Sequence, residues 1–255
     1  MQALNECEIR KFLCEDLKNI KINIFDEITS TNDFLKKEIL SRDNLEVCLA
    51  DFQTKGRGRF GRTFESPRGR GIYMSLVLKD TFIDIDSILT LRIGLAVYEA
   101  LKAYSDNLKL KWVNDIYLNE KKLGGILIEG VYNPFKQKID RLVAGIGINV
   151  LAADMPIELR DKVSFLNTKT SRNELIASIL NEIFTIRNKT SEYVVENFEK
   201  LNLLKGRYIS YMVEGREAFG KVLGISKDGF LELEVGNEKI LLNSGEVSIK
   251  SLDKE

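Results

Sequence analysis

The sequence predicts an α+β protein, in which a mixed β-sheet flanked by helices is followed by a small C-terminal β-barrel of SH3-like size. Stretches with helical apolar spacing alternate with short strand-like runs as far as Leu204. After Leu204 the helical period disappears, and glycines separate short strands at close spacing. We therefore expect a first domain over residues 1–204 and a second over residues 205–255. A chain of 255 residues can bury a sizeable core.

The first part of the chain is predicted to alternate helices and strands. Apolar spacing predicts helices over residues 5–18, from about 31 to 40, and over 86–104. Ser30, Thr31 and Asn32 offer side chains that can cap the second of these helices. Strand-like runs cover residues 20–24, 47–52 and 71–79.

The middle of the chain is predicted to supply the central strands of the sheet. Apolar, glycine-bearing runs over residues 123–132 and 142–150 are typical of strands that are buried on both faces. Before them, apolar residues alternate with lysines over residues 108–112. Asn114-Asp115 is a turn candidate.

The remainder is predicted to form two helices and then short strands. A capping box at Ser171 and Glu174 opens a helix to about Arg187, and a second helix follows over residues 191–203. Asp228-Gly229 is a hairpin signal. The predicted strands of the barrel cover residues 208–213, 218–225, 230–235, 240–242 and 247–249.

Composition excludes several classes of enzyme. The chain has 38 basic and 38 acidic side chains and no histidine, which removes Ser-His-Asp and Cys-His catalysis and His-ligated zinc. Cys7, Cys14 and Cys48 form no CxxC pair, so we expect ordinary small residues of a reduced, cytoplasmic protein. No signal-peptide pattern and no membrane-length apolar run is present in the sequence, so we expect no membrane association.

The segment from Gln53 to Gly71 gathers positive charge in an otherwise neutral chain. It has one acid, Glu65, and is rich in glycine, so we expect a mobile loop whose backbone and guanidinium groups close around phosphate or carboxylate. The alternative is a solvated surface turn. The basic residues of this segment are Lys55, Arg57, Arg59, Arg62, Arg68 and Arg70.

Residues 56–61 also satisfy the GxGxxG pattern of dinucleotide-binding folds. That pattern needs a helix that opens at its third glycine. Here the residues that follow contain Pro67 and further glycine and lead into a strand. The sequence therefore argues against a dinucleotide site.

A second segment combines cations, an amide and a carboxylate. Lys111, Asn114 and Asp115 surround a predicted strand end, and Lys122 follows before a glycine pair. Asp115 could hold Mg²⁺ or order the opposite lysine, and Lys122 could reach a bound carboxylate or phosphate. The alternative is a plain turn. The single tryptophan, Trp112, is more typical of a core than of a ligand contact.

Taken together and in this order, these segments resemble the biotin protein ligase family. Two departures are Val113, where the family usually has proline, and Phe60, where it often has a polar residue. About twenty residues precede the first strand, too few for the helix-turn-helix domain of some members, so we expect no operator binding. The matching segments are Ser30-Thr31-Asn32, the loop from Gln53 to Arg62, Lys111-Trp112-Val113-Asn114-Asp115, Lys122 to Leu127, and Gly145-Ile146-Gly147-Ile148-Asn149.

The resemblance implies a biotin–lipoate ligase fold of the class II synthetase type and an ATP-dependent ligase that uses biotin, ATP and Mg²⁺. By resemblance, the catalytic residues are Arg57, Arg59, Lys122 and Asp115, with Asp115 as the Mg²⁺ ligand. The implied biotin-binding residues are Ser30, Thr31, Asn32, Gln53, Arg57, Gly58, Arg59, Lys122, Gly124 and Gly125. The implied nucleotide-binding residues are Arg59, Arg62, Lys111, Trp112, Asn114, Asp115 and Asn149.

The implied partner is a biotin carboxyl carrier protein, the acceptor subunit or domain of a carboxylase. The resemblance is compatible with a homodimer and predicts no nucleic-acid partner. Two other functions stay open at this point. One is a lipoate–protein ligase or octanoyl transferase, which would need a long apolar slot. The other is an RNA-binding module built on the Gly-Arg loop and the small barrel, which the sequence pI of about 6.5 disfavours.

Overall fold

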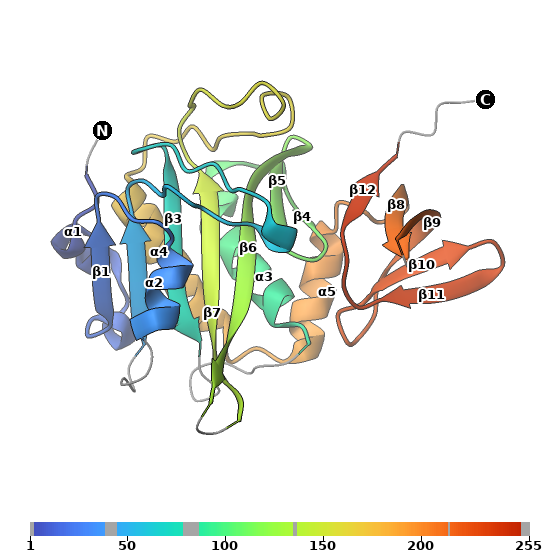
Figure 1. Cartoon of the computed structure of the whole chain (residues 1–255), viewed down its shortest axis with the longest axis horizontal. Helices are drawn as coiled ribbons and strands as arrows, with labels where there is room; N and C mark the ends of the chain where they lie inside the picture. The colour runs from blue at the N-terminus through green and yellow to red at the C-terminus, as the bar shows by residue number, and fades with distance from the viewer. Residues whose placement is uncertain (1–2, 39–44, 79–86, 135–136, 214, 251–255) are drawn as a thin grey trace.

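The structure is a computed structural model that describes residues 3–38, 45–78, 87–134, 137–213 and 215–250. It contains a seven-stranded sheet, a five-stranded sheet and the helices that pack on the larger sheet. The helices are α1 (Glu6–Phe12), α2 (Thr31–Glu38), α3 (Leu89–Leu101), α4 (Arg172–Ile186) and α5 (Ser191–Leu201). This is the α+β arrangement that the sequence predicts (Figure 1).

The larger sheet is mixed and has the strand order β1-β2-β3-β7-β6-β5-β4. The pair β1–β2 is parallel, and all the other neighbours are antiparallel. The strands are β1 (Lys21–Phe25), β2 (Glu46–Ala50), β3 (Gly71–Leu78), β4 (Leu108–Lys111), β5 (Asp115–Leu118), β6 (Lys121–Asn133) and β7 (Lys138–Asn149).

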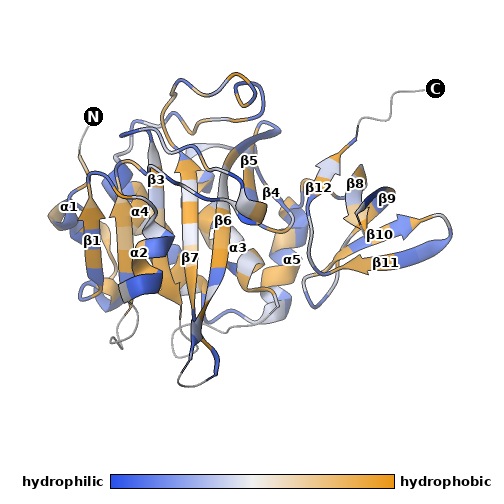
Figure 2. Ribbon diagram, viewed as in Figure 1, coloured by the Kyte–Doolittle hydropathy of each residue, from blue (hydrophilic) through white to orange (hydrophobic). Residues whose placement is uncertain are grey.

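The two faces of this sheet are covered unequally. Helices α1, α3, α4 and α5 lie behind it in Figure 1 and close the main hydrophobic core, to which α3 and α4 contribute long buried stripes. Helix α2 alone packs on the front, over a small cluster of Leu35, Cys48, Val77 and Val143. Hydrophobic residues accordingly concentrate along β1, β2 and β7 in Figure 2. Helix α2 therefore leaves most of the front of β6 and β7 uncovered.

The smaller sheet is antiparallel and has the order β11-β10-β9-β8-β12. One of its contacts with the rest of the chain runs through the turn before β10. The indole Nε1 of Trp112 donates to Gly229 O at 2.9 Å, and Ser87 Oγ donates to Asp228 O at 2.8 Å. The strands are β8 (Tyr208–Val213), β9 (Arg216–Ile225), β10 (Leu231–Val235), β11 (Glu238–Leu242) and β12 (Val247–Ile249).

Most predicted elements are confirmed to within a few residues, and the differences have local causes. The first predicted helix breaks into α1 and a 3-10 turn over Glu15–Leu17. The predicted turn at Asn114-Asp115 lies one or two residues earlier, because Asp115 already pairs with Gly125 as the first residue of β5. The sequence analysis did not foresee this four-residue strand. The predicted ends at Leu40 and Lys79 and the predicted start at Asp86 lie outside the described residues.

Within the described residues, none of the helices is long and apolar enough to cross a membrane. The boundary between domains at residues 204 and 205 stays a prediction.

We expect Arg172→Ala to lower the free energy of unfolding by about 3–5 kcal/mol, because it removes a buried cation and leaves a carboxylate and a backbone carbonyl without their donor. The guanidinium of Arg172 donates to Asp51 Oδ1 at 2.6 Å and to Gly71 O at 3.2 Å. It thereby joins the two ends of the positively charged segment from Gln53 to Gly71, called the basic loop below. The matched control is Arg160→Ala, which removes an exposed pair with Asp154 and should cost less than about 1 kcal/mol. Urea unfolding of both variants tests this; equal losses would contradict it.

Candidate active site

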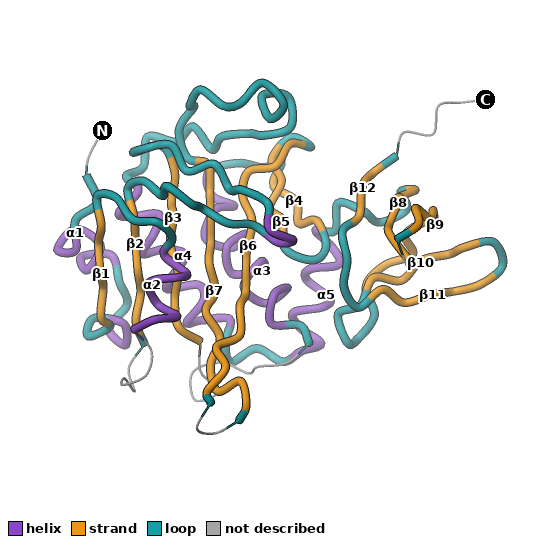
Figure 3. The backbone as a smooth tube through the Cα atoms, viewed as in Figure 1, coloured by secondary structure: helices purple, strands orange, loops and turns teal. Residues whose placement is uncertain are grey.

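The open face of the larger sheet carries a cavity of about 500 Å³, the size of a small-molecule site. Its walls are the start of α2, the basic loop, the ends of β4 to β7, the segment after β7 and residues 245–248, which lead into β12 of the smaller sheet. Figure 3 shows the basic loop and the segment after β7 running across the upper end of the sheet. All the predicted site residues line this cavity except Gly124.

At one end of the cavity, uncharged polar side chains are buried. Ser30, Thr31 and Asn32 are buried there at the start of α2, where helix N-termini favour such side chains. Ser30 Oγ accepts from Asp33 N at 3.4 Å as a cap. Gln53 Oε1 accepts from Thr31 N at 2.9 Å, which ties the base of the loop to the helix. The capping signal read from the sequence thus also places the polar groups of the site.

The glycines of β7 make room for these side chains. A Cβ at Gly145 would lie 2.4 Å from Asn32 Oδ1, and one at Gly147 would lie 2.5 Å from the Phe64 ring. Real Cβ atoms do not approach so closely, so larger residues would displace Asn32 and Phe64. The space that these glycines leave beside β7 is filled by the protein's own site residues.

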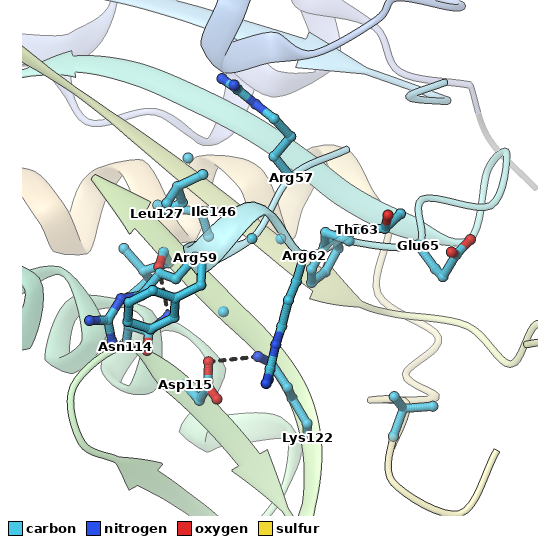
Figure 4. A pocket seen from close by; sticks show the side chains of 18 of the residues that line it. Arg57, Arg59, Arg62, Thr63, Glu65, Asn114, Asp115, Lys122, Leu127 and Ile146 are labelled. Carbon is cyan, nitrogen blue, oxygen red and sulfur yellow. Dashed lines mark hydrogen bonds and ion pairs between the residues drawn. The ribbon is translucent and has the colours of Figure 1, made fainter. Parts of the chain in front are cut away.

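The other end of the cavity is cationic. Lys122 Nζ lies 2.7 Å from Asp115 Oδ1, and Arg59 Nη1 donates to Asn114 Oδ1 at 3.3 Å (Figure 4). Burial lowers the pKa of Arg59 and of Lys111, although Asp115 nearby works in the opposite direction. Both cations are therefore held in a setting that penalises their charge, and a bound anion would relieve that penalty.

The arginines of the loop have separate destinations. Arg57 points away from Arg59 and Arg62 in Figure 4 and pairs with Asp33 at 2.5 Å and with Glu129 at 3.2 Å. Arg62 reaches Glu246 of the smaller sheet. Arg68 pairs with Glu27 at 2.6 Å and with Asp26, outside the cavity lining. Part of the loop's positive charge is thus balanced by carboxylates elsewhere in the chain.

Two stretches of the cavity wall were missed by the sequence analysis. Residues 245–248 bring Glu246 to the cationic end. Residues 155–163 close another side and fix Lys122, whose backbone N donates to Lys162 O and whose O accepts from Ser164 N, both at 2.8 Å. Neither stretch carries a motif, so topology alone could reveal them.

Comparison with known proteins places this geometry in a family. Residues 24–149 match the model of the biotin/lipoate A/B protein ligase family, and residues 211–250 match the biotin protein ligase C-terminal domain. The bifunctional ligase/repressor BirA of Escherichia coli is 30% identical over 239 residues, which cover 89% of this chain and 73% of that protein. The chain belongs to the biotin protein ligase family.

Other family members agree over nearly the whole chain. The biotin–[acetyl-CoA-carboxylase] ligase of Mycobacterium tuberculosis is 26% identical and is matched over 89% of this chain and 88% of its own length. The solved biotin protein ligase of Aquifex aeolicus, in complex with biotin and ATP, superposes with a TM-score of 0.77. It is 30% identical, over 90% of this chain and 98% of that one. Both the mixed sheet and the small C-terminal domain are thus family features.

Three residues of the family motifs occupy particular places. Gly124 faces the helix-covered side of the sheet, where a Cβ would lie 2.5 Å from the Ile148 side chain, and it does not line the cavity, so its role in biotin binding stays a prediction. Trp112 is only 3% exposed and anchors the smaller sheet, so it is a core residue at the edge of the cavity. Asn149 is buried in the cavity wall as the last residue of β7.

The residues present do not build a Mg²⁺ site on their own. Among the described residues, no group of three or more Cys, Asp and Glu side chains is placed to hold a metal ion. Asp115 is paired with Lys122. Of the two roles considered for Asp115, the structure supports ordering the lysine.

We expect Gly145→Ala to weaken biotin binding by roughly 1–3 kcal/mol, because the added methyl group overlaps Asn32. The matched control is Gly94→Ala on α3, where the nearest atoms to a Cβ lie 3.7 Å away and the change should preserve binding. Calorimetric titration with biotin measures both variants. Unchanged affinity in Gly145→Ala would contradict the glycine argument.

Proposed function

We propose that the protein is an ATP-dependent biotin–protein ligase. It joins biotin to ATP, giving biotinyl-5′-AMP and pyrophosphate, and then transfers biotin to a lysine of a biotin carboxyl carrier domain. The observation that carries this proposal is one cavity with an uncharged polar end and a cationic end. Membership of the biotin protein ligase family supports it.

The polar end is suited to the ureido ring of biotin. Hydroxyl and amide groups of Ser30, Thr31, Asn32 and Gln53 are buried or half-buried there and can pair with its carbonyl and N–H groups. A ligand without those groups would leave buried polar atoms unpaired, at about 1–3 kcal/mol each. Gly58 and Gly125 also line the cavity and add no side chains to it.

The cationic end is suited to the first chemical step. An oxygen of the biotin carboxylate forms a bond to the α-phosphorus of ATP, and the bond from that phosphorus to the bridging oxygen breaks as pyrophosphate leaves. Both reactants are anions, so Lys122 and Arg59 lower the barrier by holding them together and by balancing charge. Asp115 keeps Lys122 in position. No imidazole is required.

Lys111, Asn114, Asn149 and Arg62 are placed to bind the nucleotide, near Glu246 of the smaller sheet. Arg57 is neutralised by Asp33 and Glu129 in this structure, so we assign the phosphate to Arg59 and give Arg57 the role of tying the loop to α2. Because Asp115 is paired with Lys122, it is not a free ligand for Mg²⁺ in this structure.

In the second step, the acceptor lysine's amine attacks the acyl carbon of the adenylate, AMP leaves, and the amine loses a proton to solvent. The decisive experiment is ATP–pyrophosphate exchange. We expect exchange that depends on biotin and not on lipoate. Exchange with lipoate alone would favour the lipoate ligase function, and salt-sensitive RNA binding without exchange would favour the RNA-binding module.

We expect Arg59→Ala to lower the rate of adenylate formation about 10²–10³-fold, because a cation at the reacting oxygens is removed. The fold should persist, since this arginine sits in a loop and buries little apolar surface. Arg68→Ala is the matched control: it is an arginine of the same loop that pairs outside the cavity lining. Its rate should stay near wild type, and equal losses in the two variants would contradict the assignment.

We expect Lys122→Ala to raise KM for biotin and lower kcat together, because Lys122 acts on the carboxylate in both the ground state and the transition state. Lys122→Arg should fail to restore the rate, since a planar fork does not replace a point donor. Steady-state exchange kinetics measure both. Recovery of wild-type kinetics in Lys122→Arg would show that only the charge matters.

A further inference from the structure

A fully buried serine lies beneath the polar end of the cavity. Ser75 is on β3, is 0% exposed and is not among the residues that line the cavity. Its Oγ is 2.6 Å from Thr31 Oγ1 and 2.5 Å from Asn32 Oδ1. It therefore connects two of the residues assigned to the ureido ring. No local motif indicates this role for Ser75, because the contact joins β3 to α2 across more than forty positions.

The partners of Asn32 fix the direction of its amide. Asn32 Nδ2 donates to Glu129 Oε2 at 2.7 Å and to Leu127 O at 3.4 Å. A carboxylate and a backbone carbonyl only accept hydrogen bonds, so the nitrogen must face them and the oxygen must face Ser75.

Glu129 remains a carboxylate in this setting. Burial works to raise its pKa, but hydrogen bonds from Lys36 and Asn32 and the charge of Arg57 outweigh burial, and the pKa lies below its ordinary value. The direction of the Asn32 amide is thus set by an ionised group.

The direction then passes along the chain of contacts. Because Asn32 Oδ1 can only accept, the single hydroxyl proton of Ser75 is given to it. At 2.6 Å, Thr31 must in turn donate its own proton to Ser75 Oγ, since two oxygens without a proton between them would repel. Gln53 Oε1 accepts from the backbone N–H of Thr31 at 2.9 Å and also lies within hydrogen-bond distance of Thr31 Oγ1, at 3.1 Å. The contact with Ser75 is the shorter of the two open to the Thr31 hydroxyl, so we place the proton there. Thr31 Oγ1 is then an acceptor, and Thr31 lines the cavity.

We propose that Ser75 is a positioning residue that fixes Thr31 as a hydrogen-bond acceptor, so that the site selects a ligand with an N–H at that point. This inference rests on the proposed biotin ligase function and deepens it. The polarised series Thr31→Ser75→Asn32→Glu129 holds the acceptor before the ligand arrives, and such prearranged networks discriminate strongly against a group of the wrong polarity. Without Ser75, the Thr31 hydroxyl could rotate and donate instead.

The test uses the full chain and biotin-dependent ATP–pyrophosphate exchange, with biotin and the two cyclic carbamate analogues in which one ureido N–H is replaced by oxygen. In Ser75→Ala we expect KM for biotin to rise about tenfold, the loss of one well-made hydrogen bond. We expect the preference for biotin over one carbamate to fall by a similar factor. KM for ATP should stay within about twofold of wild type, a separation that a general packing defect would not produce.

Three further variants make the result decisive. Ser75→Thr keeps the hydroxyl and should restore much of the preference for biotin. Ser75→Cys keeps the shape with a weak donor and should lose that preference even if Ser75→Ala fails to fold. Ser210→Ala, a buried serine on β8 away from the cavity lining, should behave as wild type.

The outcomes separate the two proposals. Wild-type exchange that ignores biotin would overturn the proposed function and this inference with it. Biotin-dependent exchange in the wild type, together with unchanged selectivity in Ser75→Ala and Ser75→Cys, would overturn the role of Ser75 alone. A parallel rise in KM for ATP and for biotin would also overturn it, because the effect would then be structural.

Discussion

Three glycines on two neighbouring strands keep one face of the large sheet free of side chains, and the functional site depends on that space. Gly125 on β6 pairs with Gly147 on β7, and Gly145 lies two residues before Gly147 on the same strand. The space beside Gly125 is occupied by the side chains of Asp115 and Lys122. Phe64 occupies the space beside Gly147, and Asn32 the space beside Gly145. The opposite face of the same strands is packed by helices. One pair of strands therefore serves as a hydrophobic core on one side and as a cavity floor on the other.

A single short segment sets both the cationic end of the cavity and the position of the C-terminal sheet. Lys111 and Asn114 line the cavity, while Trp112 between them holds Gly229 through its indole N–H. A nearby backbone bond from Leu203 N to Leu110 O, at 2.8 Å, fixes the start of the connection. The C-terminal sheet is thereby held where Glu246 meets the basic loop. It contributes a wall of the cavity and is not a detached module.

Local signals account for what the sequence predicted. The cap at Ser171 and the hairpin at Asp228-Gly229 depend on neighbouring residues and are found as expected. The family motifs likewise predicted which residues share the cavity. Ion pairs were not predictable in this way, since Arg57 meets Glu129 across 72 positions and Arg62 meets Glu246 across 184. Gly124 lies outside the cavity lining, which the motif could not show, because a motif does not reveal which face of a strand each residue occupies.

The cations around the cavity fall into two groups, although the net charge of the chain is zero. Arg57, Arg62 and Arg68 are each matched by a carboxylate, which holds the loop against the body of the protein. Arg59 and Lys111 instead lie against the rings of Phe60 and Tyr117, and their burial lowers their pKa. These two charges are already partly withdrawn from water before any ligand arrives. An anion that enters between them finds its counter-charges in place and little water to reorganise, which is the physical condition under which fixed cations accelerate a reaction between two anions.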